Sequence, residues 1–343
     1  MATTRLSDVI TPEVYPMFER QSTIETTRKS AIFQSGLVET DKDLSKKVAG
    51  GGETFNVPFY NDLDRTESDI GNDDPNDEAT PDKITTGKDV ARRQFRTKGW
   101  SSMRLTKALS GDDPMRAIQS LTGKYWADDL DNIALAHLQG IVADNVANDN
   151  SDMVHDISSD DPLAPGEVPA DNELISADAI LDARQKMGDA GDIGWVMIMS
   201  SQLCTRLKKQ NLIEYIPNSE GKIKFRTYLG DQVWMSDEAT VVQGVNRPKH
   251  YVYIAKPGLL KYGPAPADMP VEVDSHPRQG KGAGAEEIWM RKQFCLHVPG
   301  VKWTEASVAG NFPTNAELAD AVNHDRVYQE RKQIPLTCLI SNG

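Results

Sequence analysis

The sequence predicts an α+β fold from which a long two-stranded loop projects. Apolar residues recur every three or four positions from about residue 114 to 147, which predicts one long helix. Alternating runs at 53–60 and 286–298 predict half-exposed strands, and the continuous apolar run Trp195–Met199 predicts a buried strand. We therefore expect a small mixed sheet in the second half of the chain and a hairpin in the first.

The composition indicates a chain with a core of its own and disfavours several classes of protein. Its 343 residues correspond to about two domains or to one domain with large excursions, and 38% of them are apolar, which is low but enough for a core. The charge of −13 (38 basic minus 51 acidic residues) disfavours a general binder of nucleic acid or anionic membranes. No apolar run reaches about 18 residues, and no basic stretch precedes an apolar one at the start, so we expect neither a transmembrane helix nor a secretory signal.

The first hundred residues divide into an arm, a hinge and a hairpin. Residues 1–48 predict an extended N-terminal arm that contains one short helix. The conformational freedom of three consecutive glycines predicts a hinge at Gly50, Gly51 and Gly52. The strand at 53–60 follows, and three apolar residues share one of its faces: Phe55, Val57 and Phe59.

The tip and the returning limb of the hairpin carry opposite charges. Residues 61–82 hold nine acidic residues and one basic residue, and turn-forming residues predict an irregular tip that includes Asp69, Asp73 and Asp74. Residues 83–107 hold eight basic residues and one acidic residue, Asp89, and the stretch Val90–Trp100 predicts the returning strand. This basic limb includes Arg92, Arg93, Arg96 and Arg104, with Trp100 among them.

Such a hairpin cannot be stable alone. Residues 61–88 hold only four apolar residues, too few to offset the entropy lost when the segment becomes ordered. The segment is therefore either disordered or laid on another surface. We favour contact between subunits, in which the acidic tip of one copy meets the basic limb of another. A solvated surface and a nucleic-acid stripe that includes Phe95 and Trp100 are the alternatives.

Local signals place the remaining elements. Asp112 and Asp113 before Pro114 predict the start of the long helix, which would extend about 50 Å. Residues 148–175 predict a loop at a domain boundary, and residues 263–285 predict a long irregular loop. Further helices are expected at 176–187, 201–210 and 313–321, and further strands at 194–200, 232–236, 251–255 and 334–340.

No catalytic or metal-binding pattern emerges from the sequence. Cys295 and His297 share one strand face, but no third metal ligand lies near them in the sequence. The chain has three cysteines, Cys204, Cys295 and Cys338, which are too few for a disulfide framework. The acidic tip lacks the glycine and terminal glutamate of a calcium-binding hand, which leaves weak cation binding as a lesser alternative to a solvated loop. No nucleophile motif or dinucleotide motif is present. We therefore expect no enzyme activity, no cofactor and no metal site.

Most of the chain nevertheless resembles a known family, the major capsid proteins of tailed phages. No single motif carries the resemblance, which runs in order through many segments. These segments are TTRLSDVITPEVYPMFERQ, TFNVPFYNDL after the hinge, KITTGKDVARRQFRTKGWSS, GDDPMRAIQSLTGKYWADDL, KKQNLIEYIPNSEGK, FCLHVPGVKW and PTNAELADAVNHDRVYQERKQI.

The resemblance implies the Hong Kong 97-like capsid fold, which encapsulins and herpesvirus capsid floors share. Residues 1–48 would be the N-terminal arm, and residues 49–107 the extended loop (E-loop) that lies over a neighbouring subunit. The long helix would be the spine of a peripheral domain, formed by 108–175 and 285–325. An axial domain would comprise 176–284 and 326–343. The candidate subunit-interface residues are then Gly50, Gly51, Gly52, Phe55, Val57, Phe59, Asp69, Asp73, Asp74, Arg92, Arg93, Arg96, Trp100 and Arg104.

The implied function is that of a structural protein. The chain would form hexamers and pentamers of an icosahedral shell that encloses double-stranded DNA without binding it specifically. It would be assembled in the host cytoplasm and reside in the virion, without a membrane. Its partners would be itself, a portal protein and separate scaffolding or decoration proteins, because no scaffolding segment precedes the arm. The alternatives are an encapsulin-like compartment shell, another phage structural protein, and a soluble carboxylate- or metal-dependent enzyme.

Overall fold

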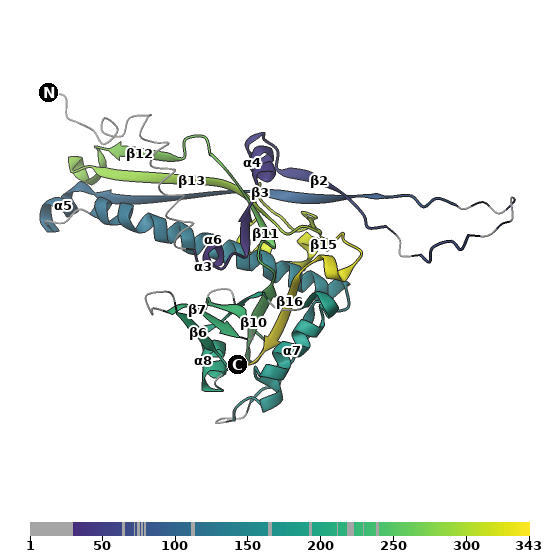
Figure 1. Cartoon of the computed structure of the whole chain (residues 1–343). Coiled ribbons are helices and arrows are strands. Elements are labelled where there is room, and N and C mark those ends of the chain that lie inside the picture. Colours follow the sequence, from purple (N-terminus) through teal and green to yellow (C-terminus); the bar gives the residue numbers. More distant parts are fainter. Residues whose placement is uncertain are drawn as a thin grey trace.

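The computed structural model describes most of the chain and shows an α+β fold with two sheets on either side of one long helix (Figure 1). The predicted fold class is confirmed at this level. Residues 1–29 of the predicted arm and Asp74 of the predicted tip lie outside the described residues. The described residues are 30–63, 66–71, 73, 76, 78, 80–110, 114–163, 167–191, 194–210, 212–217, 223–228, 230–237 and 240–343.

The long helix α6 (Pro114–Asn148) is the centre of the molecule. It has 35 residues and begins at a proline, which suits the first turn of a helix. Its first half packs against one sheet, where Trp126 meets Ile288 and Met290. Its second half, which includes Leu138, is buried between both sheets. The prediction of one helix over 114–147 is therefore confirmed within a residue.

The first sheet carries the hairpin. Its order is β1 (Val38–Thr40), β11 (Leu260–Ala265), β13 (Ala285–His297), β3 (Thr86–Met103) and β2 (Thr54–Tyr60), and β12 (Val271–His276) also pairs with β13. Strand β3 has 18 residues and serves two partners. Residues 86–92 pair with β2, and residues 93–103 pair with β13. One continuous strand thus joins the hairpin to the body of the molecule.

The prediction of an irregular loop over 263–285 is wrong. Most of its first half belongs to β11 and β12, and both strands run antiparallel to β13. Pro264 and the surrounding turn-forming residues caused the error. Pro264 lies beyond the part of β11 that pairs with β1, and an unpaired edge tolerates proline.

The second sheet is mixed and supports two helices. Its order is β4 (Val154–Asp156), β16 (Leu336–Ser341), β10 (Pro248–Ala255), β5 (Val196–Met199), β8 (Asp231–Met235), β7 (Ile223–Tyr228) and β6 (Glu214–Pro217), and β9 (Val241–Gln243) pairs with β10. Helices α7 (Ala177–Gln185) and α8 (Ser201–Lys209) pack on one face of this sheet. Ser176 and Ser200 cap these helices by accepting backbone N–H bonds, as the sequence predicts for Ser176.

Shorter elements complete the fold. The helices are α3 (Ala31–Gln34), α4 (Lys42–Ala49), α5 (Arg104–Ser110) and α9 (Asn315–Leu318), and β14 (Val301–Trp303) pairs with β15 (His324–Arg326). Single 3₁₀ turns lie at Asp171–Glu173, Gly188–Gly191, Gln279–Gly282, Ala321–Asn323 and Arg331–Gln333.

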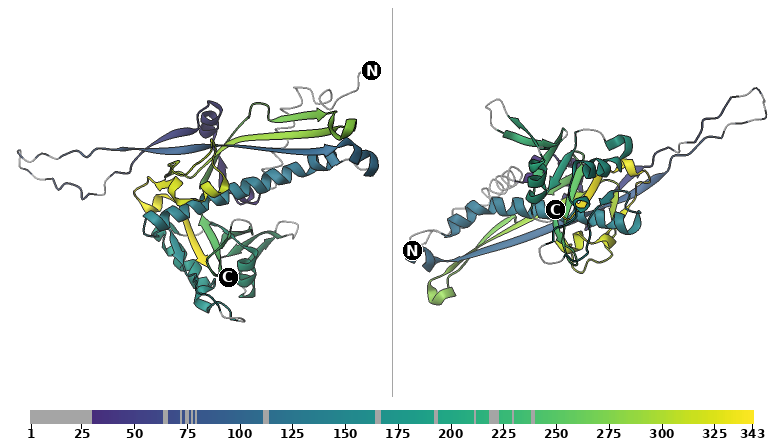
Figure 2. Two further views of the ribbon diagram at one scale, coloured as in Figure 1. Left: turned by 180° about the vertical axis from the view of Figure 1, so that it is seen from behind. Right: turned by 90° about the horizontal axis from the view of Figure 1, so that it is seen from below.

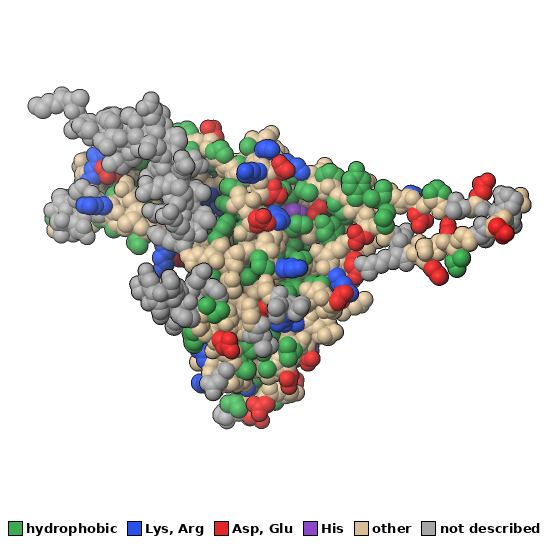
Figure 3. Space-filling view, viewed as in Figure 1, with side chains coloured by type: hydrophobic (Ala, Val, Ile, Leu, Met, Phe, Trp, Pro, Cys, Tyr) green, Lys and Arg blue, Asp and Glu red, His purple; other side chains and the backbone are tan. Residues whose placement is uncertain are grey.

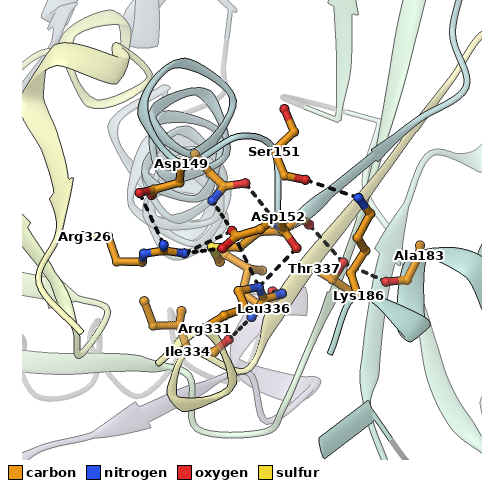
Figure 4. Close-up of polar contacts among 12 residues, drawn as sticks. Asp149, Ser151, Asp152, Ala183, Lys186, Arg326, Arg331, Ile334, Leu336 and Thr337 are labelled. Atoms are coloured by element: carbon orange, nitrogen blue, oxygen red, sulfur yellow. Dashed lines mark hydrogen bonds and ion pairs between the residues drawn. The ribbon is translucent and has the colours of Figure 1, made fainter. Parts of the chain in front are cut away.

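A charged cluster at the end of α6 holds the turn between α6 and β4 against β15 and the segment that leads into β16 (Figure 4). Nη1 of Arg326 lies 3.0 and 2.8 Å from the two carboxylate oxygens of Asp152, and its Nη2 lies 3.4 Å from Asp149. Arg331 donates to the carbonyl oxygens of Ile334 and Leu336 at 2.7 and 2.6 Å. Burial lowers the pKa of Arg331 to about 10, so it is still charged at neutral pH. The turn that leads from α6 into β4 is therefore held by ion pairs as well as by packing.

Candidate subunit-contact surface

The hairpin begins at a turn that needs glycine. Gly50 ends α4, and its N–H donates to the carbonyl oxygens of Lys46 and Lys47. Gly51 and Gly52 follow with φ angles of 95° and 96°, in the left-handed region that other residues adopt at a cost. The three glycines therefore redirect the chain from α4 into β2, at the place where the sequence predicts a hinge.

The apolar face of β2 packs against its own chain. Phe55 is 7% exposed and contacts Leu44 and Val48 of α4. Val57 packs on the edge of the same cluster. The predicted shared face is correct, but Phe55 is already covered and leaves little surface for a neighbouring copy.

Phe59 also has a partner within the chain. Its ring meets Tyr328 edge to face, with ring centroids 4.8 Å apart. Gly87 lies opposite Phe59 in the ladder, and a Cβ there would lie 2.2 Å from the ring. Glycine at this position therefore makes room for the aromatic ring beneath the root of the hairpin.

A buried carboxylate fixes β3 to the end of β13. Asp89 is 2% exposed, and its Oδ2 lies 2.8 Å from Nε2 of His297 and accepts the Gly300 N–H at 3.0 Å. Sequence reasoning missed this pair, since it grouped His297 with Cys295. The signal in the sequence that could have revealed the pair is Asp89 itself, the one acidic residue within the basic limb.

The arginines of the basic limb have acceptors in the same chain. Nη1 of Arg92 lies 2.8 Å from Glu305 and 3.4 Å from Glu53, and its side chain is 3% exposed. Arg93 donates to the Val48 carbonyl, and its guanidinium lies over the ring of Phe55. These two residues hold the hairpin against the body.

Arg96 and Trp100 lie where β3 pairs with β13, and Arg104 follows as the first residue of α5. Arg96 donates to Pro313 O and to Asn315 Oδ1, both at 3.0 Å, and burial lowers its pKa. Trp100 packs edge to face on Tyr125, and Arg104 pairs with Glu286 at 2.7 Å. The structure thus separates these residues from the acidic tip. Each of the four arginines already has an acceptor within the chain.

The tip of the hairpin is exposed throughout. All described residues between 62 and 86 are exposed, including Asp69 and Asp73. Two apolar side chains among them, Leu63 and Ile70, are 67% and 85% exposed. The hairpin extends beyond the body in every view, and acidic side chains follow its length (Figures 1, 2 and 3). The chain itself therefore leaves the tip of the hairpin uncovered.

The described residues can be compared with what a reactive thiol, a metal site or a membrane-spanning helix requires. Burial raises the pKa of the Cys295 thiol to about 12, so a thiolate does not form there at neutral pH. Within the described ranges, no cluster of three or more His, Cys, Asp or Glu side chains could hold a metal ion. In that same part of the chain, no helix is long and apolar enough to cross a bilayer.

Comparisons with known proteins show which family this chain resembles. The model of the Gp13-like family, described as major capsid protein 13-like, matches residues 49–335. The chain is 37% identical over 336 residues to the major capsid protein of Bacillus phage SPP1, covering 97% of this chain and 96% of that relative.

Solved structures are similar at much lower identity. The capsid of Ralstonia phage GP4 has a TM-score of 0.58 at 10% identity and 92% coverage of both chains. The capsid asymmetric unit of cyanophage Pam1 has a TM-score of 0.56 at 11% identity, covering 92% of this chain and 93% of that one. At such identity these likenesses show the fold alone. The match of the family model and the full-length relative show that the chain belongs to the Gp13-like family of major capsid proteins.

Proposed function

We propose that this capsid protein adopts the Hong Kong 97-like fold and self-assembles into hexamers and pentamers of an icosahedral shell. The shell would enclose the double-stranded DNA of a tailed phage. Family membership supports the role in the virion, and the two capsid structures support the general architecture. Assembly in the host cytoplasm is part of the same proposal.

The exposed hairpin is the observation that carries the proposal. A two-stranded ribbon is marginally stable in water, and this one presents apolar residues to solvent at its tip. Its root is fixed by Asp89 and Arg92, so the ribbon is held in an extended direction. A neighbouring copy that covers the tip would bury these side chains and stabilise both partners.

Charge indicates which surface would receive the tip. Three basic residues, Lys98, Arg116 and Lys124, are exposed at the opposite end of the molecule, on β3 and the first turns of α6. Lys98 lies over the Tyr125 ring, 5.6 Å from its centroid. The acidic tip of one copy would therefore meet a basic, partly aromatic surface on the next. Of the interface candidates, Asp69 and Asp73 fit this role best.

The domain division follows the same proposal. We assign 1–48 to the N-terminal arm, 49–107 to the E-loop, and α6 to the spine of a peripheral domain over 108–175 and 285–325. The axial domain would comprise 176–284 and 326–343. Because β11 and β12 pair with β13, we propose one change to this division: residues 260–284 belong with the peripheral domain, which leaves 176–259 and 326–343 to the axial domain.

The remaining partners are proposals of the same kind. A portal protein and separate scaffolding or decoration proteins would complete the particle. The DNA would be enclosed rather than gripped, which fits a net charge of −13.

Negative-stain electron microscopy of the purified protein, with its mass from light scattering, tests the proposal. We expect closed shells or rings of five and six subunits. A compact monomer at high concentration would overturn the proposal. Particles that lack nucleic acid and contain an enzyme would instead indicate an encapsulin-like compartment.

A further inference from the structure

A basic groove runs along α8 on the second sheet. It has a volume of about 450 Å³, and Val168, Leu174, Arg206 and Lys209 are among the residues that line it. Val168 is 77% exposed, so the groove has an apolar rim. The Nε of Arg206 donates to Ile175 O at 3.2 Å, and its Nη2 lies 3.6 Å from Asp171 Oδ1, so this guanidinium already has partners within the chain. Among the described residues, no ion pair involves Lys209.

An acidic ridge lies on α7. Asp178, Leu181 and Asp182 are exposed, and their spacing of three and four residues places them on one helix face. Leu181 is 47% exposed, while Ile180 and Ala183 on the other face are buried against the sheet. In the described part of the structure, neither aspartate makes an ion pair.

No residue of α7 lines the groove, although one wall of the groove, formed by Val168, Pro169 and Leu174, precedes that helix in the chain. Helix α7 contacts β4 and β16 at one edge, and Thr337 of β16 donates to the carbonyl of Ala183. Helix α8 connects β5 to β6 toward the other edge. Figure 1 shows the two helices on opposite sides of the lower part of the molecule. A single copy therefore cannot bring its own ridge into its own groove.

We propose that the ridge on α7 of one copy docks in the groove beside α8 of the next copy. Leu181 would enter the groove beside Val168 and Leu174, and Asp178 and Asp182 would face Lys209. Two different patches that fit each other form a head-to-tail contact, and such contacts close into rings. This inference rests on the proposed function, because it assigns the contact between axial domains within a hexamer or pentamer.

The chemistry of the contact suits a ring of either size. The apolar contact at Leu181 would supply most of the affinity, while the exposed charges set orientation and the rate of encounter. The long, exposed side chain of Lys209 can follow the small change in angle between five and six subunits. The same patch can therefore serve both capsomers.

Charge reversal and its compensation test this inference. Asp182→Lys and Lys209→Glu alter exposed side chains, so both variants should fold, which thermal unfolding checks. Each single variant should give at least tenfold fewer shells than the unaltered protein by sedimentation and electron microscopy. The double variant D182K/K209E should recover shell yield to within about twofold. Lys256→Glu, an exposed lysine outside both patches, is the matched control and should assemble normally.

The outcomes separate the two proposals. If the unaltered protein forms shells and both single variants do so equally well, the docking contact is wrong and the proposed function stands. If the single variants fail and the double variant fails too, the two patches do not meet and the inference is again wrong. If the unaltered protein stays monomeric under all conditions, the proposed function falls, and this inference with it.

Discussion

Asp89 and His297 form a buried pair that joins the hairpin to the body of the capsid protein. Asp89 Oδ2 lies 2.8 Å from His297 Nε2, and the two side chains are 3% and 5% exposed. The same oxygen accepts the Gly300 N–H. Because β3 continues from this point toward the tip, the pair sets the direction in which the hairpin leaves the body.

Removal of this carboxylate should destabilise the subunit. Asp89→Ala leaves His297 and the Gly300 N–H buried without a partner, which we expect to lower the free energy of unfolding by about 3 kcal/mol. Asp89→Asn keeps an acceptor for Gly300 and should cost about half as much. Urea unfolding with an unchanged m-value measures both effects. Asp69→Asn at the exposed tip is the control, and a loss for Asp89→Ala as small as the control's would refute the role of the pair.

Gly140 marks a close contact between α6 and the segment at 318–324. A Cβ at this position would lie 2.2 Å from Leu318 O and 2.4 Å from His324 Nε2. Glycine to alanine usually stabilises a helix by about 1 kcal/mol, but here overpacking should destabilise by about 1–3 kcal/mol. Gly50→Ala is the comparison, since its Cβ would meet nothing closer than 3.5 Å. Equal unfolding midpoints for the two variants would argue against the close contact.

Two buried histidines predict a loss of stability in acid. The rings of His137 and His324 meet with centroids 5.0 Å apart. Burial lowers the pKa of His324 to about 4, and burial together with His324 and His297 lowers the pKa of His137. Below pH about 6.5 the unfolded chain binds protons that the folded chain does not, so stability falls as the pH drops from about 6.5 to 4. The slope is up to about 1.4 kcal/mol per pH unit for each histidine.

The protonation of Asp144 stabilises the folded chain as the pH falls, which opposes the effect of the histidines. The measurement therefore needs a comparison with a variant. Burial raises the pKa of Asp144 to about 6, so between pH about 4 and 6 the folded chain holds a proton that the unfolded chain has lost. The histidine contribution is therefore read from the difference between the unaltered protein and His324→Gln, whose amide can still donate to Leu318 O. Urea unfolding at several pH values should give a shallower decline for the variant. Parallel curves would contradict the assignment to His324.

Where the sequence predicted an element well, the signal was local. Helix α6 begins at Pro114, and its apolar spacing persists to the end. Ser176 caps α7 and the alternation over 286–298 gives β13, as expected. Strands β11 and β12 had no such signal, because pairing with β13 rather than their own composition stabilises them. The family resemblance and the expectation of a structural protein rather than an enzyme are confirmed by the relatives.

The candidate contact surface was predictable only in part. Alternation placed Phe55, Val57 and Phe59 on one face correctly, and the exposed acidic tip followed from composition. Apart from Glu53, however, the partners of Arg92 and Arg96 lie more than 200 residues away, in the segment at 305–315. No local pattern reveals contacts at that separation, so side chains that hold the hairpin on its own body looked like free interface residues.

Deletion of the tip should separate folding from assembly. Removing residues 61–82 joins Tyr60 to Lys83 and leaves three residues before Thr86, enough for a hairpin turn. The deleted side chains that the structure describes are almost all exposed, so the unfolding midpoint should change little. Closed shells should disappear, because the surface that a neighbour covers is gone.

A second variant distinguishes the charge of the tip from its presence. Asp69→Asn with Asp73→Asn keeps the length of the hairpin and removes two exposed charges. If charge sets the register between copies, this variant should assemble more slowly and with a weaker dependence on salt, yet still close shells. Light scattering over time at two salt concentrations measures both properties. Shells of normal size and stability from the deletion would show that the hairpin does not bind a neighbour, since a contact that can be removed without effect cannot hold the shell together.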